Sequence, residues 1–410
     1  NSDTEVAVVE GVGAAPCTQY DNVDSIYHAS LNSHEKALAL FSHTIHPIEY
    51  NEYESSYFEK QPLLCNRNNG NYFKGLFSKS SLEKILAQNV LALGSDVDIM
   101  RVENNVPLQL LPNSKQRENS NHSKKKAELF WVSTEEDIKE GSELKHEVTA
   151  SDIKKYLKDN CFIRLLSPQK FDDSMWRFMS YIECLFNNRV GCHIYMIPAG
   201  VVGHGLRANH TDIHLMQIEG NLSVEVYKPS EEKSELPRQS KTEVDVNDYR
   251  NSGMINAILY PGDTLYIPRG WFYSISSCIG DQASLSLQLN TNEYSAYADL
   301  LDMILPQAVD MCVDECIDIR QALPRDVGNF MGVSSVVADA DSDSEDESEE
   351  TVDGDEEVNH DAIMRKDKEK EHKKILMQQR SQFRRKMTLL LNQVVANTVD
   401  LLDVGVDQVW

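Results

Sequence analysis

Residues 191–289 alternate between apolar and other side chains with a period of two, and this pattern limits the fold more than any other feature of the chain. Such alternation is typical of β-strands that have one face in a core. Turn signals rich in Pro, Gly and Asp separate the alternating segments, at 198–200, 219–220, 261–263 and 269–270. Many short strands joined by such turns predict a mainly β fold, a double-sheet jelly roll.

Apolar residues at helical spacing flank this region on both sides. Before it, the spacing predicts helices over 35–45, 80–93, 151–157 and 174–186. Ser81 is the expected N-cap of the second of these helices. After the jelly roll it predicts a helix that Pro306 interrupts, with pieces at 297–305 and 308–322, and a last helix at 386–402.

Changes in composition divide the chain into segments. A polar stretch without periodicity at 1–35 predicts a disordered leader, and a stretch rich in Ser, Asn, Lys and Glu at 113–147 predicts a solvated insertion. The jelly-roll domain with its N-terminal helices is expected to occupy 36–295. Three further segments are expected after it: a helical region at 296–335, an acidic linker at 336–362 and a C-terminal segment at 363–410.

The charge is strongly negative but uneven. The chain has 40 Lys and Arg against 65 Asp and Glu, a net charge of −25, and 13 of the acids lie in residues 339–361, which contain no Lys or Arg. This balance excludes a protein whose whole surface binds nucleic acid, so we expect contact with nucleic acid only indirectly. The basic stretch 365–386 holds ten Lys and Arg and is either an RNA contact or an exposed helix face.

The cysteines and the hydropathy of the chain indicate an intracellular protein without membrane helices. Eight cysteines are scattered without a close-set framework, which is typical of reduced intracellular thiols. Cys312 and Cys316 are four residues apart with no His nearby, which favours core packing over a zinc site. No apolar run approaches the ~18–20 residues of a membrane helix, so no membrane contact is expected. The first residue is Asn1, so we expect a fragment whose targeting signals are not in view.

Several blocks of sequence, in order, resemble the JmjC-type ribosomal oxygenases. These are nucleolar histidyl hydroxylases that modify ribosomal proteins and have also been described as histone lysine demethylases. The resemblance extends from about residue 36 to the end and implies a nuclear, nucleolar protein that contacts a ribosomal-protein or histone segment. The blocks that carry it are 59–64, 72–78, 164–169, 217–220 and 261–270.

This family implies Fe(II) held by two His and one carboxylate, with open positions for 2-oxoglutarate and oxygen. The family's metal motif can be laid on the chain from Pro198 without a gap. Its first His falls on Arg207 and its Asp on Asn209, and its second His falls on Tyr273. All three expected metal ligands are therefore replaced.

The cosubstrate positions are changed as well. The Lys that would pair with the distal carboxylate of 2-oxoglutarate falls on Leu222, and an expected Asn falls on His193, whereas the family's Tyr195 is kept. Arginine does not deprotonate to bind iron, and a leucine leaves a buried carboxylate unpaired at a cost of several kcal/mol. We therefore predict a catalytically impaired binding module that binds neither Fe(II) nor 2-oxoglutarate well.

Two alternatives stay open. His210, Asp212 and His214 form a shifted H-x-D-x-H sequence, which could hold iron with His193 or His204 as the third imidazole and keep the protein an active dioxygenase. Otherwise these are surface side chains near a turn. A different class of function is an acidic scaffold or chaperone for ribosomal proteins, which would use the negative charge.

The helical region after the jelly roll predicts assembly. Its apolar side chains form a surface that we judge too broad for one contact with the jelly roll. The resemblance implies a homodimer through 297–322, with Leu301 and Ile304 near its centre; the alternative is packing on the same chain's jelly roll. The expected surface consists of Leu300, Leu301, Ile304, Ala308, Met311 and Ile317. Residues 403–408 resemble the opening of the family's winged-helix domain, so the segment 363–410 is expected to be a truncated start of it.

Overall fold

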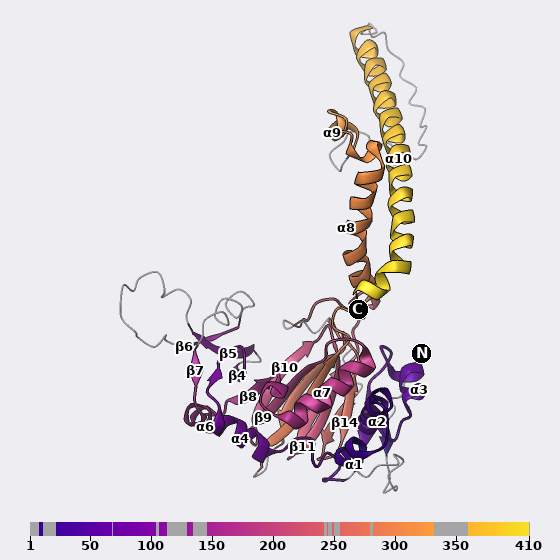
Figure 1. Ribbon diagram of the computed structural model, residues 1–410. Coiled ribbons are helices and arrows are strands. Elements are labelled where there is room, and N and C mark those ends of the chain that lie inside the picture. Colours follow the sequence, from indigo (N-terminus) through magenta and orange to yellow (C-terminus); the bar gives the residue numbers. More distant parts are fainter. Residues whose placement is uncertain are drawn as a thin grey trace, which may run out of the picture. The chain divides into compact units, whose positions relative to one another are not determined.

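The computed structural model describes two compact units, Asn1–Ser295 and Ala296–Trp410 (Figure 1). Each unit is described by itself below. Within them, the described residues are 8–10, 22–67, 69–103, 106–112, 129–133, 146–241, 244, 248–249, 255–278, 282–331 and 360–409.

Two β-sheets form the centre of the first unit. A ten-stranded sheet has the order β1-β2-β14-β11-β16-β9-β8-β4-β5-β6, and a four-stranded sheet has the order β10-β15-β12-β13. The strands of the large sheet are β1 (Val8–Glu10), β2 (Leu63–Asn66), β4 (Val97–Glu103), β5 (Val106–Pro112), β6 (Leu129–Val132), β8 (Phe162–Leu166), β9 (Gly191–Ile197), β11 (Asp212–Glu219), β14 (Thr264–Ile267) and β16 (Ser284–Thr291). The small sheet contains β10 (Val202–Ala208), β12 (Leu222–Tyr227), β13 (Ile255–Leu259) and β15 (Phe272–Ser277).

The inner faces of the two sheets share one apolar core. Strand β12 shows how the alternation produces it, because Leu222, Val224 and Val226 are fully buried while the residues between them are partly exposed. Side chains from β9, β11, β14 and β15 complete this core. The predicted mainly β jelly-roll fold is confirmed, and its period-two signal came from burial on one face of each strand.

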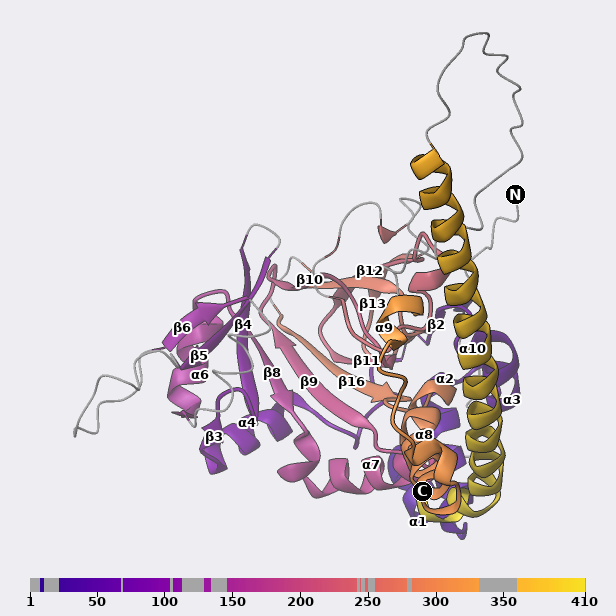
Figure 2. The same cartoon turned by 90° about the horizontal axis from the view of Figure 1, so that it is seen from above.

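Helices cover the outer face of the large sheet (Figures 1 and 2). They are α1 (Val23–His28), α2 (Ser33–Ile45), α3 (Tyr50–Glu52), the π-helical turn η1 (Tyr53–Tyr57), the 3₁₀ turn η3 (Pro168–Lys170) and α7 (Asp173–Phe186). Asn32 and Glu35 form a capping box that fixes the start of α2. Phe41 of this helix is fully buried and meets Tyr53 and Phe186 edge to face, so the helical layer and the sheet form a second core.

A smaller group of elements lies beside the large sheet. It contains α4 (Lys79–Gln88), α6 (Ala150–Lys158), the short pair β3 (Leu91–Ala92) and β7 (Glu147–Val148), while the 3₁₀ turn η4 (Glu232–Ser234) follows β12. The expected N-cap at Ser81 is wrong. Ser78 caps α4 instead, and its hydroxyl accepts from the Ser81 backbone N–H at 3.1 Å.

Two segments expected to be unstructured contain regular elements. In the predicted leader 1–35, β1 pairs in parallel with β2, and α1 begins at an Asn22 cap with Val23 and Ile26 buried. In the predicted insertion 113–147, β6 pairs with β5 because it carries a short run of apolar and aromatic residues. The rest of the insertion falls largely outside the described residues.

The second unit contains α8 (Tyr297–Glu315), the 3₁₀ turn η6 (Ile317–Arg320), α9 (Val327–Phe330) and α10 (His360–Val409). The predicted break at Pro306 is wrong, because α8 continues through it. A proline inside a helix removes one backbone donor, and packing along the rest of α8 sustains the helix. Ala308 and Cys312 of α8 pack with Val394 of α10.

The described residues of the C-terminal segment form one long helix, α10. Residues 360–409 contain no proline and their only glycine is Gly405, so nothing in the sequence ends a helix that is rich in Lys, Glu, Gln, Arg and Leu. The predicted start of a winged-helix domain at 363–410 thus falls on one continuous helix, α10, and stays a prediction. The expected acidic linker 336–362 lies almost entirely outside the described residues. None of the described helices is long and apolar enough to cross a membrane.

The stability of the first unit is expected to come from its two apolar cores. Burial of aliphatic and aromatic side chains contributes about 25 cal/mol per Å² of apolar surface, without any ion. We predict that a metal chelator leaves the melting temperature, followed by circular dichroism, unchanged relative to untreated protein. A fall of more than a few degrees would show that a structural metal contributes to the fold.

Candidate functional site

The three replaced metal positions come together at one end of the small sheet. Arg207 on β10 lies opposite Tyr273 on β15 in the antiparallel register, and Asn209 follows directly after β10. The Arg207 Nε donates to the Asn209 side-chain oxygen at 3.2 Å, and the Asn209 side chain also hydrogen-bonds the Tyr273 hydroxyl. The sequence alignment thus selected three side chains that contact one another.

The cosubstrate positions lie in the core between the sheets. Leu222 on β12 and Tyr195 on β9 are both buried and pack in the same apolar core as Tyr273. Leu222 has no exposed surface at all, and it offers no cation for a carboxylate. His193 precedes Tyr195 by two residues on β9, so the strand period places it on the same inner face.

Two neutral imidazoles lie near Arg207. Burial, together with the charges of Arg164 and Arg207, lowers the pKa of His193 to about 3. Burial and Arg207 likewise lower the pKa of His204 to about 3. His204 Nδ1 donates to the Gly205 carbonyl at 3.1 Å, which leaves Nε2 as an acceptor without a partner among the described residues.

A buried ion pair, which the sequence analysis did not identify, lies behind this cluster. Arg164 on β8 contacts Asp98 on β4 through Nε at 2.9 Å and through its terminal nitrogen at 2.6 Å, and it also hydrogen-bonds Tyr195. Although burial opposes it, the Asp98 carboxylate raises the pKa of Arg164 above its usual value. The only sequence signal was the position of Arg164 in the block 164–169, because its acidic partner is 66 residues away.

The residues present do not fit an Fe(II) and 2-oxoglutarate site. Arg207 is a permanent cation, Asn209 carries no charge, and burial raises the pKa of Tyr273 above its usual value so that the phenol stays protonated. Among the described residues, no three His, Cys, Asp or Glu side chains are grouped so that they could hold a metal ion. No chemical step through iron is therefore derived for this chain.

The shifted motif does not form a site either. Asp212 and His214 are on β11 with their side chains on the outer face, because the alternate residues Ile213 and Leu215 belong to the inner core. His210 precedes the strand, and its Nδ1 lies 2.7 Å from the Ser240 hydroxyl. The expectation that His210, Asp212 and His214 could share a metal is wrong.

Each member of the shifted motif has separate structural partners. Asp212 accepts hydrogen bonds from the Tyr266 hydroxyl at 2.9 Å, the Arg269 backbone at 3.1 Å and the Asn292 amide at 2.6 Å. Burial raises its pKa to about 6 despite these donors. His214 Nε2 lies 3.1 Å from the Tyr53 hydroxyl inside a cage of aromatic rings, and burial lowers its pKa to about 3.

His204 does not join the shifted motif as a third imidazole. Its ring packs edge to face against the ring of Tyr273, with the two ring centroids 4.9 Å apart. Tyr273 belongs to the core between the sheets, on the opposite side of the large sheet from His214. His193 is likewise on the inner side. The two faces of the strands thus separate the imidazoles that an active site would have to combine.

Comparison with known proteins identifies the class of this domain. A family profile described as the JmjC domain matches residues 164–297, which contain all four replaced positions. This part of the chain is therefore similar to a JmjC domain.

Relatives identify the family more closely. A bifunctional lysine-specific demethylase and histidyl-hydroxylase NO66 from Branchiostoma floridae is 28% identical over 75% of this chain and 42% of its own length. Ribosomal oxygenase 1 from Danio rerio is 26% identical over 74% of this chain and 50% of its own length. Over about three quarters of its length, the chain is thus similar to the JmjC ribosomal oxygenases. It spans half or less of the length of these two relatives.

Solved structures of an Escherichia coli ribosomal oxygenase, YcfD, are also similar. One is 12% identical, covers 78% of this chain and 66% of its own, and has a TM-score of 0.39. Another, in complex with cobalt and 2-oxoglutarate, is 14% identical, covers 68% of this chain and 60% of its own, and has a TM-score of 0.37.

Buried neutral histidines predict loss of stability in acid. His43, with a pKa of about 4, and His193, His204 and His214 all titrate near 6.5 once unfolded, so their contribution is complete above pH 6.5 and is lost as the pH falls. Asp212, raised from 3.8 to about 6, acts oppositely, since its contribution is lost as the pH rises from 4 to 6. Because four histidines outweigh one aspartate, we predict that the free energy of unfolding rises between pH 4 and 6.

A single variant isolates this effect from general acid unfolding. Each buried histidine contributes up to about 1.4 kcal/mol per pH unit to the slope. His214→Phe fits its aromatic surroundings and removes one titrating ring, so we expect urea unfolding to show a slope lower by about that amount between pH 4 and 6. An unchanged slope would mean that His214 is not neutral in the folded protein.

Proposed function

We propose that this chain is a catalytically impaired JmjC ribosomal-oxygenase-like protein that binds basic segments of ribosomal proteins or histones. The observation that carries the proposal is the replacement of all four iron and cosubstrate positions by Arg207, Asn209, Tyr273 and Leu222, which contact one another or pack in the core. Family relatives named as histidyl hydroxylases and demethylases supply the substrate class. A nuclear, nucleolar location belongs to the same proposal.

The charge of the first unit supports the proposed partner. Residues 1–295 contain 39 Asp and Glu against 28 Lys and Arg, an excess of 11 negative charges. Negative potential of this kind attracts Lys- and Arg-rich segments and speeds their association. Such binding needs neither iron nor 2-oxoglutarate. An acidic scaffold for ribosomal proteins would show the same attraction, but it would not depend on the jelly roll.

The first test is titration with cofactors. We expect no heat of binding when 2-oxoglutarate is added to the protein with Mn(II) as a stand-in for Fe(II), because Arg207, Asn209 and Tyr273 offer the metal no carboxylate or imidazole ligand and Leu222 offers the cosubstrate no cation. The matched variant combines Arg207→His, Asn209→Asp, Leu222→Lys and Tyr273→His, and we expect it to bind 2-oxoglutarate at least tenfold more tightly. Micromolar binding by the unchanged protein would contradict the impairment.

The binding role is also tested by measuring heats of binding. A Lys- and Arg-rich histone-tail peptide should bind equally in the presence and absence of a chelator, and more weakly as salt screens the charges. Loss of peptide binding on chelation would show that the site works with a metal. Equal binding to the isolated acidic segment 339–361 would favour the scaffold.

We also propose that the second unit pairs two chains. An exposed apolar stripe, Leu301, Leu305 and Val309, follows α8 at four-residue spacing, with exposed fractions of about 40% each. The expected centre at Ile304 is corrected, because this side chain is only 2% exposed within one chain. A self-complementary interface around Leu301 is the usual arrangement for such a surface.

Light scattering tests the dimer. We expect about twice the chain mass of 46.5 kDa, and Leu301→Glu should shift the protein toward the monomer because it places a charge in the apolar stripe. Gln307→Glu, an equal charge change at an exposed position on another face of α8, is the control and should stay dimeric. A monomeric wild-type protein at tens of micromolar would end this proposal.

A further inference from the structure

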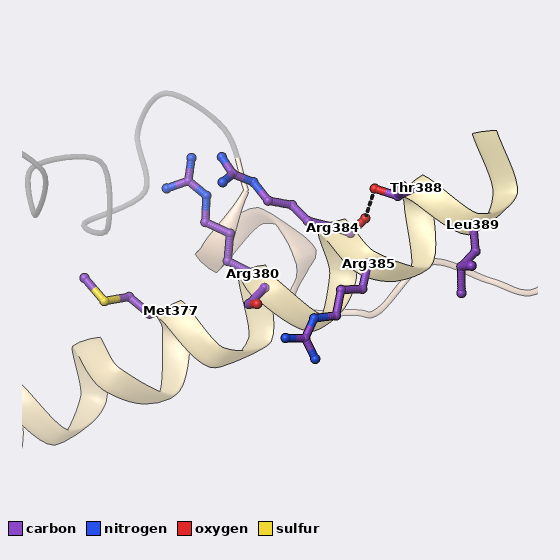
Figure 3. A pocket seen from close by; sticks show the side chains of 7 residues that line it. Met377, Arg380, Arg384, Arg385, Thr388 and Leu389 are labelled. Atoms are coloured by element: carbon purple, nitrogen blue, oxygen red, sulfur yellow. Dashed lines mark hydrogen bonds between the residues drawn. The ribbon is translucent and has the colours of Figure 1, made fainter. Parts of the chain in front are cut away.

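The second unit carries a hollow on the surface of α10 that the proposed function does not use. Its volume is about 670 Å³, and the described residues that line it all belong to this helix (Figure 3). The lining combines three guanidinium groups with two hydroxyls and two apolar side chains: Arg380, Arg384, Arg385, Ser381, Thr388, Met377 and Leu389.

The charge of this helix is opposite to that of the chain. Residues 372–399 contain six Lys and Arg and no Asp or Glu, although the whole chain carries −25. Lys386 is engaged, since its ammonium lies 2.6 Å from the Gln321 amide oxygen and 4.0 Å from the Asp318 carboxylate. In the described part of the chain, no carboxylate lies within ion-pair distance of Arg380, Arg384 or Arg385. The hollow is therefore lined by three arginines that have no carboxylate partner among the described residues.

Two of these cations project in the same direction. Figure 3 shows the Arg380 and Arg384 side chains extending to one side of α10, with Arg385 on the other side. They are four residues apart, the spacing at which like charges on a helix repel. The Arg380 Nε is buried, and no described residue accepts its hydrogen bond. An anion between the two guanidinium groups would remove the repulsion and supply the missing acceptor.

We propose that this face of α10 binds the phosphate backbone of a single-stranded nucleic acid. The planar guanidinium group of arginine pairs with phosphate oxygens through two hydrogen bonds. Arg380 and Arg384 are about one helical turn apart, about 5.4 Å along the axis, so a flexible nucleic-acid backbone can contact both. The Ser381 and Thr388 hydroxyls add polar groups at the same surface. Since all these groups address phosphate, the site distinguishes neither base nor sugar.

An acidic protein segment is the less favoured occupant. Protein interfaces depend on a buried apolar or aromatic anchor, and the lining offers only Met377, which is 41% exposed, and Leu389, which is 71% exposed. Backbone binding needs only the row of cations. Along the helix itself, the acids nearest these arginines are Glu371 and Asp400.

Fluorescence anisotropy with the full chain tests the site. The probes are labelled oligouridine and oligothymidine of about 20 nucleotides, at salt concentrations from about 50 to 200 mM. We expect both probes to bind alike and more weakly as salt rises. The variant R380Q/R384Q/R385Q should weaken binding and lower the slope of log K against log salt by about 1.4, since Arg380 and Arg384 lie on the same side of α10 and each lost phosphate contact removes about 0.7.

A matched control separates the site from overall charge. The variant K154Q/K155Q/K158Q removes three exposed cations from α6 and should bind like the wild type. Glutamine is a good helix former, and equal ellipticity at 222 nm shows that α10 is intact in the first variant. An equal loss of affinity in both variants would overturn the proposal.

The chain's own acidic segment is the competing occupant. A further variant replaces the 13 acids of residues 339–361 by Ser, Asn and Gln. The proposal is supported if the wild-type protein binds the oligonucleotides and this variant binds them more tightly. Binding seen only in this variant would assign the face to the acidic segment, and no binding by either protein would leave no nucleic-acid site; both results overturn the proposal. None of these outcomes depends on the impairment proposed for the jelly roll.

Discussion

Burial of both faces of strand β11 is the constraint on which the candidate site depends. Ile213 and Leu215 point into the core between the two sheets, and His214 and Met216 point under the helices that cover the outer face. A slip of one residue would exchange the two faces and place His214 among aliphatic side chains. The register is therefore fixed, and a metal motif shifted by three residues falls on the wrong side of the sheet.

Much of the fold could be predicted because burial follows the strand and helix periods. The alternation in β12 is a local signal that tertiary packing does not override. The misplaced cap at Ser81 reflects a choice between two serines three residues apart, whereas the false break at Pro306 depends on a neighbour that is distant in sequence. Ser78 and Ser81 are both good caps, and α8 continues because α10 packs along it.

The candidate site could be predicted in part. Two separately aligned blocks were sufficient to select Arg207 and Asn209 in the first and Tyr273 in the second, and the fold brings the three side chains together. It did not reveal the ion pair of Arg164 with Asp98, since no local pattern links residues on two different strands. The neutral state of His193 could not be inferred either, because it results from burial and from two arginines that approach it only in the folded chain.

The replacements make sense as a set when their charges are considered together. A metal site places a dication among neutral imidazoles and a carboxylate, and here Arg207 brings a positive charge to that place in the chain itself. The carboxylate that a metal would need has become Asn209, which accepts a hydrogen bond from Arg207 instead of binding an ion. The combination leaves one cation, Arg207, beside a neutral acceptor, a protonated phenol and two uncharged imidazoles. These side chains contact one another inside the jelly roll, so the fold at this place needs no metal to hold them together.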